Sequence, residues 1–319
     1  MELSFRRVVE CLHSPFCRSL KVFYFQARNW SLNRQPAAMS GIERSVMPII
    51  VLVLSVVFSA LIPGAHAQTP YANSVVEYSS GTGFTPGYDD PTSALGEPSR
   101  ATPGMFPGPV DPFNPPYLPS QIVSIGNAGF ITLQLDTSIF NESANPFGID
   151  FVIFGNNGFT ITNGDFGGGG ITDGSTFTFD PPGTSRVLVS SDGIIYYELV
   201  PPSNIDAVVD GLFPTDGSGN FQTPVDPTLT RDDFAGAGLP EIRALYAGAA
   251  GGTGFDLAWA QNDLGNPANL TDARFVRIES LAGKIEIDGL AVVPEPATWM
   301  LSVLGGVLLW AIRAGRGTR

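Results

Sequence analysis

Apolar and polar residues alternate with a period of two along much of the middle of the chain. In the segment 130–136, Ile131, Leu133 and Leu135 would face one side of a strand, and the polar residues between them the other side. The same pattern predicts strands at 74–78, 149–154, 176–179, 186–190, 195–200, 255–260, 274–280 and 284–292. One short helix is expected at 239–247, before Gly248. Many short strands and almost no helix predict an all-β fold, an antiparallel β-sandwich.

Three segments between these strands have distinctive turn chemistry. Asp192-Gly193 predicts a hairpin with a tight turn, because this pair readily adopts positive φ angles. The segment 98–119 holds eight prolines and cannot form a central strand or a helix, so it is expected to be a loop. Its aromatic residues, Phe113 among them, would pin it to the sandwich or bind a ligand. The glycine-rich segment 164–174 is expected to be a flexible loop.

An uncharged apolar run near the start of the chain predicts an export signal. Arg44 precedes the run 47–62, and Ala65 and Ala67 follow it with the spacing that signal peptidase recognises, so the mature chain would start at Gln68. We interpret 39–67 as the signal peptide. A signal peptide does not normally begin 46 residues before its apolar core, so we expect translation to start at Met39. Residues 1–38 would then be a gene-model extension, the alternative being a long genuine leader.

A second apolar run lies at the C-terminal end. Its 16 uncharged residues, 297–312, would form a helix of roughly 24 Å, long enough to cross a bilayer that thins locally. The run follows the triplet Pro294, Glu295 and Pro296 and precedes the basic residues Arg313, Arg316 and Arg319. Because positive charge favours the cytoplasmic side, the pattern predicts one transmembrane helix with the body of the protein outside.

This order of triplet, apolar helix and arginines resembles the PEP-CTERM sorting signal of Gram-negative surface proteins. The resemblance covers 294–319 and implies that an exosortase cuts at or near the triplet and passes the body to the cell surface or extracellular matrix. Signal peptidase and exosortase would be partners during export, and the membrane would hold the precursor through its C-terminal helix. The alternative is a plain C-terminal membrane anchor.

The 226 residues between these signals, 68–293, form the expected ectodomain, and they are strongly acidic. They hold seven basic and 26 acidic residues, a net charge of −19, which disfavours binding to nucleic acid. They contain no cysteine and no histidine, which excludes disulfides, the usual zinc sites and nucleophiles activated by histidine. Oxygen chemistry remains: paired carboxylates for glycoside cleavage, or binding of hard cations.

Two segments resemble discoidin-like, galactose-binding-type jelly rolls: 187–199, and 273–280 followed by 285–290. The resemblance implies a jelly-roll-like sandwich. By analogy with such domains, a structural calcium ion would tie the opening loop to the closing strand, with oxygens from Asp89, Asp90 and Glu97 and from Glu286 or Asp288. Tyr196 and Tyr197 stand where a tryptophan is frequent, and the disulfide of many such domains is missing.

Together these observations predict a non-enzymatic, exported cell-surface or matrix protein with extracellular polysaccharide as its candidate ligand. Two alternatives stay open: a carbohydrate-active hydrolase that uses paired carboxylates, and a purely structural matrix component. No sequence motif selects a carboxylate pair, so no catalytic residue is assigned.

Overall fold

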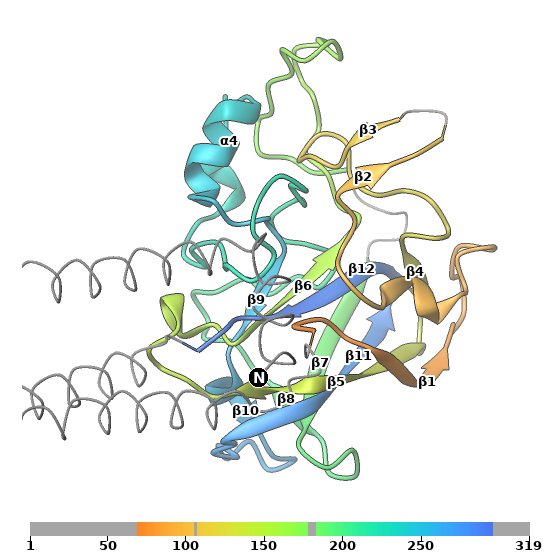
Figure 1. Cartoon of the computed structure of the whole chain (residues 1–319), viewed down its shortest axis with the longest axis vertical. Helices are drawn as coiled ribbons and strands as arrows, with labels where there is room; N and C mark the ends of the chain where they lie inside the picture. Colours follow the sequence, from red (N-terminus) through yellow and green to blue (C-terminus); the bar gives the residue numbers. More distant parts are fainter. Residues whose placement is uncertain (1–68, 105–106, 178–182, 296–319) are drawn as a thin grey trace, which may run out of the picture. The chain divides into compact units, whose positions relative to one another are not determined.

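The structure, a computed structural model, describes residues 69–104, 107–177 and 183–295. Over these ranges it consists mostly of β-strands in antiparallel sheets, with one α-helix (Figure 1). No helix within these ranges is long and apolar enough to span a bilayer. The leader 1–38, the signal peptide 39–67 and the expected transmembrane helix 297–312 lie outside the described residues. The prediction of an all-β antiparallel fold is confirmed for the ectodomain.

Two sheets form the sandwich. The first has six strands in the order β1 (Ser74–Ser79), β5 (Phe130–Phe140), β11 (Asp272–Ala282), β7 (Thr184–Ser190), β8 (Tyr197–Leu199) and β10 (Ala260–Gln261). The second has four, in the order β4 (Val123–Gly126), β12 (Lys284–Val292), β6 (Phe151–Gly155) and β9 (Thr253–Phe255). Apolar residues that alternate along these strands fill the space between the sheets, among them Leu133 on β5, Val276 on β11 and Ile287 on β12.

The outer side of the four-stranded sheet is buried as well, because long loops cover it. All five residues of β6 are buried. Phe151 and Ile153 belong to the core between the sheets, whereas Val152 and Phe154 pack with Phe221 in a separate cluster. This double burial explains why β6 reads as a continuous apolar run instead of an alternating one.

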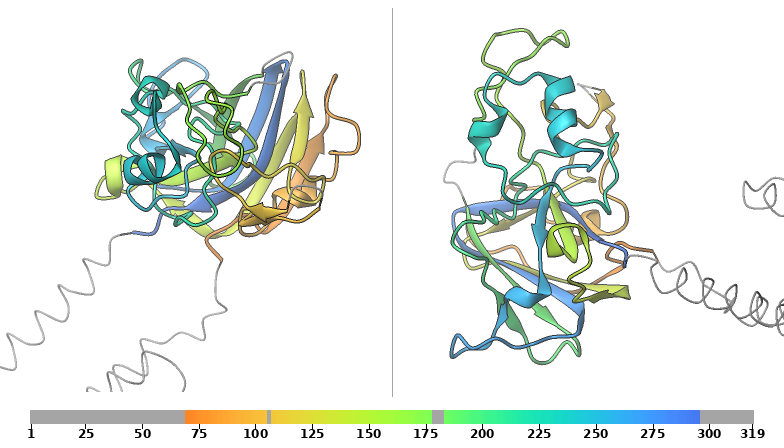
Figure 2. Two further views of the ribbon diagram at one scale, coloured as in Figure 1. Left: turned by 90° about the horizontal axis from the view of Figure 1, so that it is seen from above. Right: turned by 90° about the vertical axis from the view of Figure 1, so that its left-hand side faces the viewer.

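The covering loops contain the smaller elements. They are the two-stranded ribbon of β2 (Ala101–Thr102) and β3 (Gly108–Pro109), the helix α4 (Leu239–Tyr246), and the 3-10 turns η2 (Pro91–Ala94), η3 (Pro146–Gly148), η4 (Arg231–Phe234) and η5 (Leu257–Trp259). In Figure 2 (right) α4 and the loops around it lie beyond one end of the sandwich. Phe159, Phe213, Phe234 and Tyr246 form their own apolar core, with ring centroids 5.0–6.2 Å apart.

Most predicted elements are confirmed, and one strand is wrong. Strand β12 has the predicted bounds, and α4 ends at Tyr246, with Ala247 and Gly248 at positive φ. The strand expected at 255–260 is instead the end of β9, the turn η5 and the start of β10. Asp256 interrupts it, because its carboxylate accepts the amide of Ala258 at 2.7 Å and starts a 3-10 turn. Of the strand expected at 176–179, the described residues form only a single bridge from Thr176 to Phe159.

The hairpin at Asp192-Gly193 forms, but its turn is longer than predicted. Strands β7 and β8 pair antiparallel, with Val189 opposite Tyr197. Between them the Asp192 carboxylate accepts the amides of Ile194 and Ile195 at 2.8 and 3.0 Å. These hydrogen bonds replace ladder pairs and widen the turn, so the tight two-residue turn is a wrong prediction.

The two ends of the described chain lie side by side. Tyr71 forms a bridge with Ala291, and the amide of Val292 donates to the carbonyl of Pro70 at 2.7 Å. The amide of Val293 donates to the carbonyl of Asp150 at 2.9 Å, and Val293 is buried. Among the described residues, Val293, directly before Pro294, is therefore the last one that the fold buries.

Candidate functional site

Two segments singled out in the sequence, the proline-rich and glycine-rich loops, meet at one pocket. Its volume is about 450 Å³. We call it the loop pocket. It is lined by Pro107, Asp111, Phe113 and Asn114 from the first loop, by Ile161, Asp165, Phe166, Gly168 and Gly170 from the second, and by Leu239 of α4. Aromatic and aliphatic side chains beside a few acids and amides are the usual lining of a small-ligand site.

The proline-rich side of the loop pocket is held by a compact turn. The Asp111 Oδ1 atom accepts the backbone amides of Phe113 and Asn114 at 2.9 and 3.0 Å. The Asn114 side-chain amide donates to the carbonyl of Pro109 at 3.0 Å. Phe113 packs against the apolar core of the covering loops. Phe113 therefore holds the proline-rich loop to the covering loops and not to the sandwich as predicted, and the turn presents Asp111 and Asn114 at the pocket wall.

The glycine-rich side of the loop pocket is held in shape by hydrogen bonds from polar side chains of that loop. The Asn163 side chain donates to the carbonyl of Gly169 at 2.8 Å, and its Oδ1 accepts the amide of Ile171 at 3.2 Å. The Asp165 carboxylate accepts the amide of Gly167 at 2.8 Å. Phe166 stands at the tip with 81% of its surface exposed, an unusual position for a phenylalanine that makes no core contact. The loop therefore holds Phe166 at the mouth of the pocket.

The electrostatics of the loop pocket are acidic. Asp111 and Asp165 are the ionisable residues of its lining. Burial raises the pKa of the Asp111 carboxyl, although its two amide donors act in the opposite direction. The guanidinium of Arg243 lies near Asp111 but is committed to Asp216, whose carboxylate it contacts at 2.6 and 3.1 Å.

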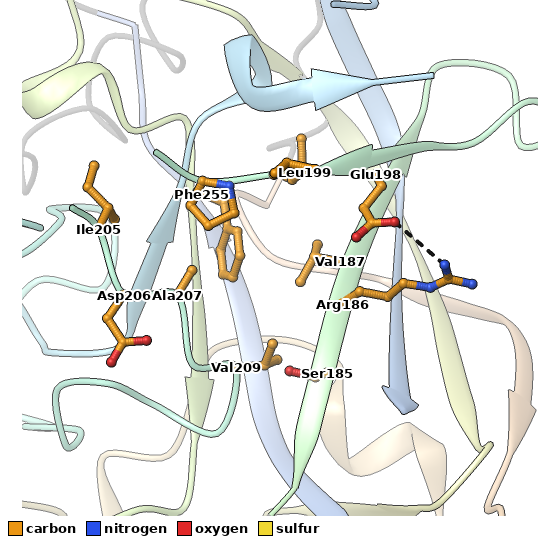
Figure 3. Close-up of a pocket in the computed structure, with 12 residues that line it drawn as sticks. Ser185, Arg186, Val187, Glu198, Leu199, Ile205, Asp206, Ala207, Val209 and Phe255 are labelled. Carbon is orange, nitrogen blue, oxygen red and sulfur yellow. Dashed lines mark ion pairs between the residues drawn. The ribbon is translucent and has the colours of Figure 1, made fainter. Parts of the chain in front are cut away.

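A second, smaller pocket of about 250 Å³ lies at the side of the sandwich (Figure 3). Strands β7, β8 and β9 and the segment 200–209 surround it. Val187, Leu199 and Phe255 line its inner side, yet each is at most 4% exposed because each belongs to the core between the sheets. Arg186 and Glu198 form an ion pair of 3.5 Å at its edge. It offers a ligand little apolar surface, so the loop pocket is the better candidate site.

The residues expected to bind calcium have other partners in the structure. Asp90 is exposed and accepts the amide and hydroxyl of Thr92 at 2.9 and 2.7 Å, and Asp89 is also exposed. Glu97 pairs with Arg100 at 2.6 Å. The described residues contain no group of three or more Asp, Glu, His or Cys side chains placed to hold a metal ion. The calcium site stays a prediction.

The opening loop is nevertheless tied to the closing strand, by direct hydrogen bonds. The carboxylate of Asp288 accepts the amide of Ser99 at 2.7 Å and the Ser99 hydroxyl at 2.8 Å. The carboxylate of Glu286 accepts the Thr85 hydroxyl and the Asn156 side-chain amide, both at 2.6 Å. Glu286 and Asp288 are each 3% exposed. The sequence therefore identified the two segments and acids that are joined, but by a different interaction.

Burial governs the titration of the deepest acids. It raises the pKa of Asp288 to about 7, against the two hydrogen bonds from Ser99. It also raises the pKa of Asp150 and of Asp210, each to about 6. Asp150 accepts the amides of Glu142 and Leu257 and so joins the segment before β6 to η5. Asp288 and Asp150 thus anchor loops, whereas Asp210 Oδ1 is buried without a hydrogen-bond partner among the described residues, and none of the three is a lining residue of the loop pocket or the smaller pocket.

The sorting and cleavage residues lie mostly outside the described part of the chain. Pro294 and Glu295 are exposed. Ala65, Ala67, Gln68, Pro296, Arg313, Arg316 and Arg319 fall outside the described residues. No family model matches this chain, and a search of curated proteins finds no match to it either.

Sequence reasoning missed most of the loop pocket. It noted Phe113 and both loops, but it assigned no role to Asp111, Asn114, Ile161, Asp165 or Phe166. The available signal was the long proline-rich loop with aromatic residues, since such loops usually serve packing or binding. Nothing in the spacing shows that 98–119 and 164–174 meet.

Proposed function

We propose that this protein is an exported, non-enzymatic component of the cell surface or extracellular matrix, sorted through its C-terminal PEP-CTERM-like signal, and that it binds extracellular glycan at the loop pocket. The β-sandwich is the folded body, and the two apolar end segments serve transport. Exosortase and signal peptidase are its partners in export across the inner membrane of a Gram-negative-type bacterium.

The way the fold ends supports the sorting part of the proposal. Val293 is buried and hydrogen-bonded, whereas Pro294 and Glu295 are exposed. A protease needs exposed backbone, and Pro294 and Glu295 provide it directly after the last strand. Because Tyr71 bridges to Ala291, both transport segments would leave the body from the same place, and their removal would leave every strand intact.

The lining of the loop pocket supports the glycan part. Phe113 and Phe166 offer aromatic rings for the apolar face of a sugar, and Asp111, Asn114 and Asp165 offer hydrogen-bond acceptors for its hydroxyls. Phe166 is the observation that carries this step, because it lines the pocket and 81% of its surface is open to a ligand. The paired carboxylates of a hydrolase gain no comparable support, since Asp150 and Asp288 are hydrogen-bonded to loops and line neither this pocket nor the smaller one.

The sorting step is tested by changing Pro294, Glu295 and Pro296 together to alanine in the native cells. We expect the wild-type body to reach the surface without its C-terminal helix, and the variant to stay in the membrane at full mass. Mass spectrometry of the C-terminus measures the difference, and alanine at Pro201 and Pro202 is the matched control. Recovery of the wild-type body from the cytosol with both apolar segments attached would contradict the proposal.

A further inference from the structure

The loop pocket carries charge of one sign only. Its ionisable lining residues are Asp111 and Asp165, and no lysine or arginine lines it. The whole ectodomain has a net charge of −19, so the field around the pocket is negative as well. A ligand that approaches the pocket therefore meets acceptors and negative charge in its lining, while the nearby cation of Arg243 lies outside the lining and is paired with Asp216.

Six of the seven basic residues between 68 and 293 have polar partners elsewhere. Arg100 pairs with Glu97, Arg186 and Arg277 both pair with Glu279, and Arg243 pairs with Asp216. Arg274 donates to the carbonyl of Leu135, and Lys284 donates to the Thr85 hydroxyl. Arg231 lies near Asp210, and its Nε is buried without a hydrogen-bond partner among the described residues. None of the seven is among the lining residues of the loop pocket.

From these placements, and resting on the proposed glycan binding, we propose that the loop pocket selects a pyranose unit bearing a protonated amino group and discriminates against uronic acids. The ammonium group would donate charge-assisted hydrogen bonds to Asp111 and Asp165, while the sugar face packs on Phe166 and Phe113. A uronate would bring a third negative charge beside two carboxylates and would find no charged donor.

The burial of Asp111 strengthens this selection. A half-buried carboxylate has lost part of its hydration. Binding a cation to it therefore lowers the free energy more than binding a cation to a carboxylate at an open surface. Asp165 is exposed and contributes less, through attraction that salt screens. The preference for an amino sugar should therefore shrink with added salt without vanishing.

The test uses the full chain in a detergent without a sugar headgroup, and calorimetric titration with three hexamers. They are glucosamine, N-acetylglucosamine and a uronic acid, at a pH where the amine is protonated. We expect the glucosamine hexamer to bind about tenfold more tightly than the acetylated one, and the uronate hexamer to bind most weakly. Phe166→Ala should weaken both of the binding hexamers about tenfold, with unchanged thermal unfolding.

Two double variants locate the effect. Asp111→Asn with Asp165→Asn keeps the shape and one acceptor oxygen in each side chain but removes the charge, and it should make the glucosamine and acetylated hexamers bind equally. Asp206→Asn with Asp263→Asn removes the same charge elsewhere, at the smaller pocket and at an exposed position, and should keep the preference.

The outcomes separate two failures. Equal binding of all three hexamers, or a preference that survives the Asp111 and Asp165 changes, overturns the selectivity and leaves glycan binding standing. A preference lost in the Asp206 and Asp263 control also overturns it, because the site would then lie elsewhere. Failure of every hexamer to bind overturns the proposed glycan binding itself.

Discussion

At the scale of single residues, buried acids act as anchors between loops and strands. Asp288 holds Ser99, Glu286 holds Thr85 and Asn156, and Asp150 holds Leu257. Each contact joins segments that are far apart in the sequence. Desolvation opposes the charged form of Asp288 and Asp150, and it raises their pKa values above the ordinary value. The same residues therefore make folding stability depend on pH.

Asp288→Asn tests this dependence. The pKa of Asp288 is about 7 in the fold against 3.8 in the unfolded chain, so the folded state binds the extra proton between these values. Its contribution to stability is complete below pH 3.8 and is lost as the pH rises through 7, on the order of 4 kcal/mol. We expect the wild type to lose stability between pH 3.8 and about 7, and Asp288→Asn to lose clearly less.

Urea unfolding at several pH values measures this effect. Asp263→Asn, at an exposed position, is the control and should follow the wild type. Asp150 and Asp210, whose pKa values burial raises to about 6, add losses of the same sign in both proteins. Identical pH profiles for wild type and Asp288→Asn would show that Asp288 titrates at its ordinary value in the fold.

At the scale of elements, strands in which apolar and polar residues alternate were predicted well. A segment in which a side chain hydrogen-bonds to the nearby backbone was not. Strand β12 keeps its predicted bounds because both of its neighbours, β4 and β6, pair along it. The segment 255–260 is apolar enough for a strand, yet Asp256 caps the turn η5 within it. Trp259, in the same segment, packs against the core, with its ring 6.3 Å from that of Phe255.

Gly155→Ala tests how closely β6 approaches the covering loops. A Cβ atom at residue 155, the last of β6, would lie well inside contact distance of the Asp210 backbone. A Cβ atom and a backbone cannot rotate away from each other as flexible side chains can. We therefore expect a loss of about 3 kcal/mol in the free energy of unfolding. Gly108→Ala is the matched control, since its Cβ would meet only Asn114 Nδ2 at 3.6 Å. Equal urea midpoints for the two variants would contradict the close approach.

At the scale of the whole molecule, the covering loops form a second apolar core outside the sandwich. Phe213 comes from a loop, Phe234 from the turn η4, and Ile242 and Tyr246 from α4. This core holds the proline-rich loop through Phe113 and places it beside the glycine-rich loop. The candidate site therefore depends on loop packing rather than on the sheets.

Removal of metal tests how the opening loop is joined to the closing strand. The hydrogen bonds of Asp288 and Glu286 make that junction directly, so we expect excess chelator to leave the thermal midpoint unchanged. Differential scanning calorimetry with and without chelator is the measurement. A midpoint that falls with chelator and recovers with added calcium would favour the calcium ion, because a ligand of the folded state stabilises it by mass action.

The sequence by itself determined the fold class, most strands and the chemistry that residues 68–293 lack. These follow from composition and from a period of two, which are properties of neighbouring residues. Alternation along β5 and β11, for instance, needs no knowledge of their partners. The expected transport segments rest on equally local patterns.

The tertiary structure alone decided which loops meet and which acids are buried. Asp111 and Asp165 share a pocket although 54 positions separate them, and only the packing of the covering loops brings them together. Asp288 reads like any solvated acid in the sequence, and its raised pKa comes from burial beneath the loop that carries Ser99. Long-range contacts and desolvation depend on the whole chain, so no local pattern encodes them.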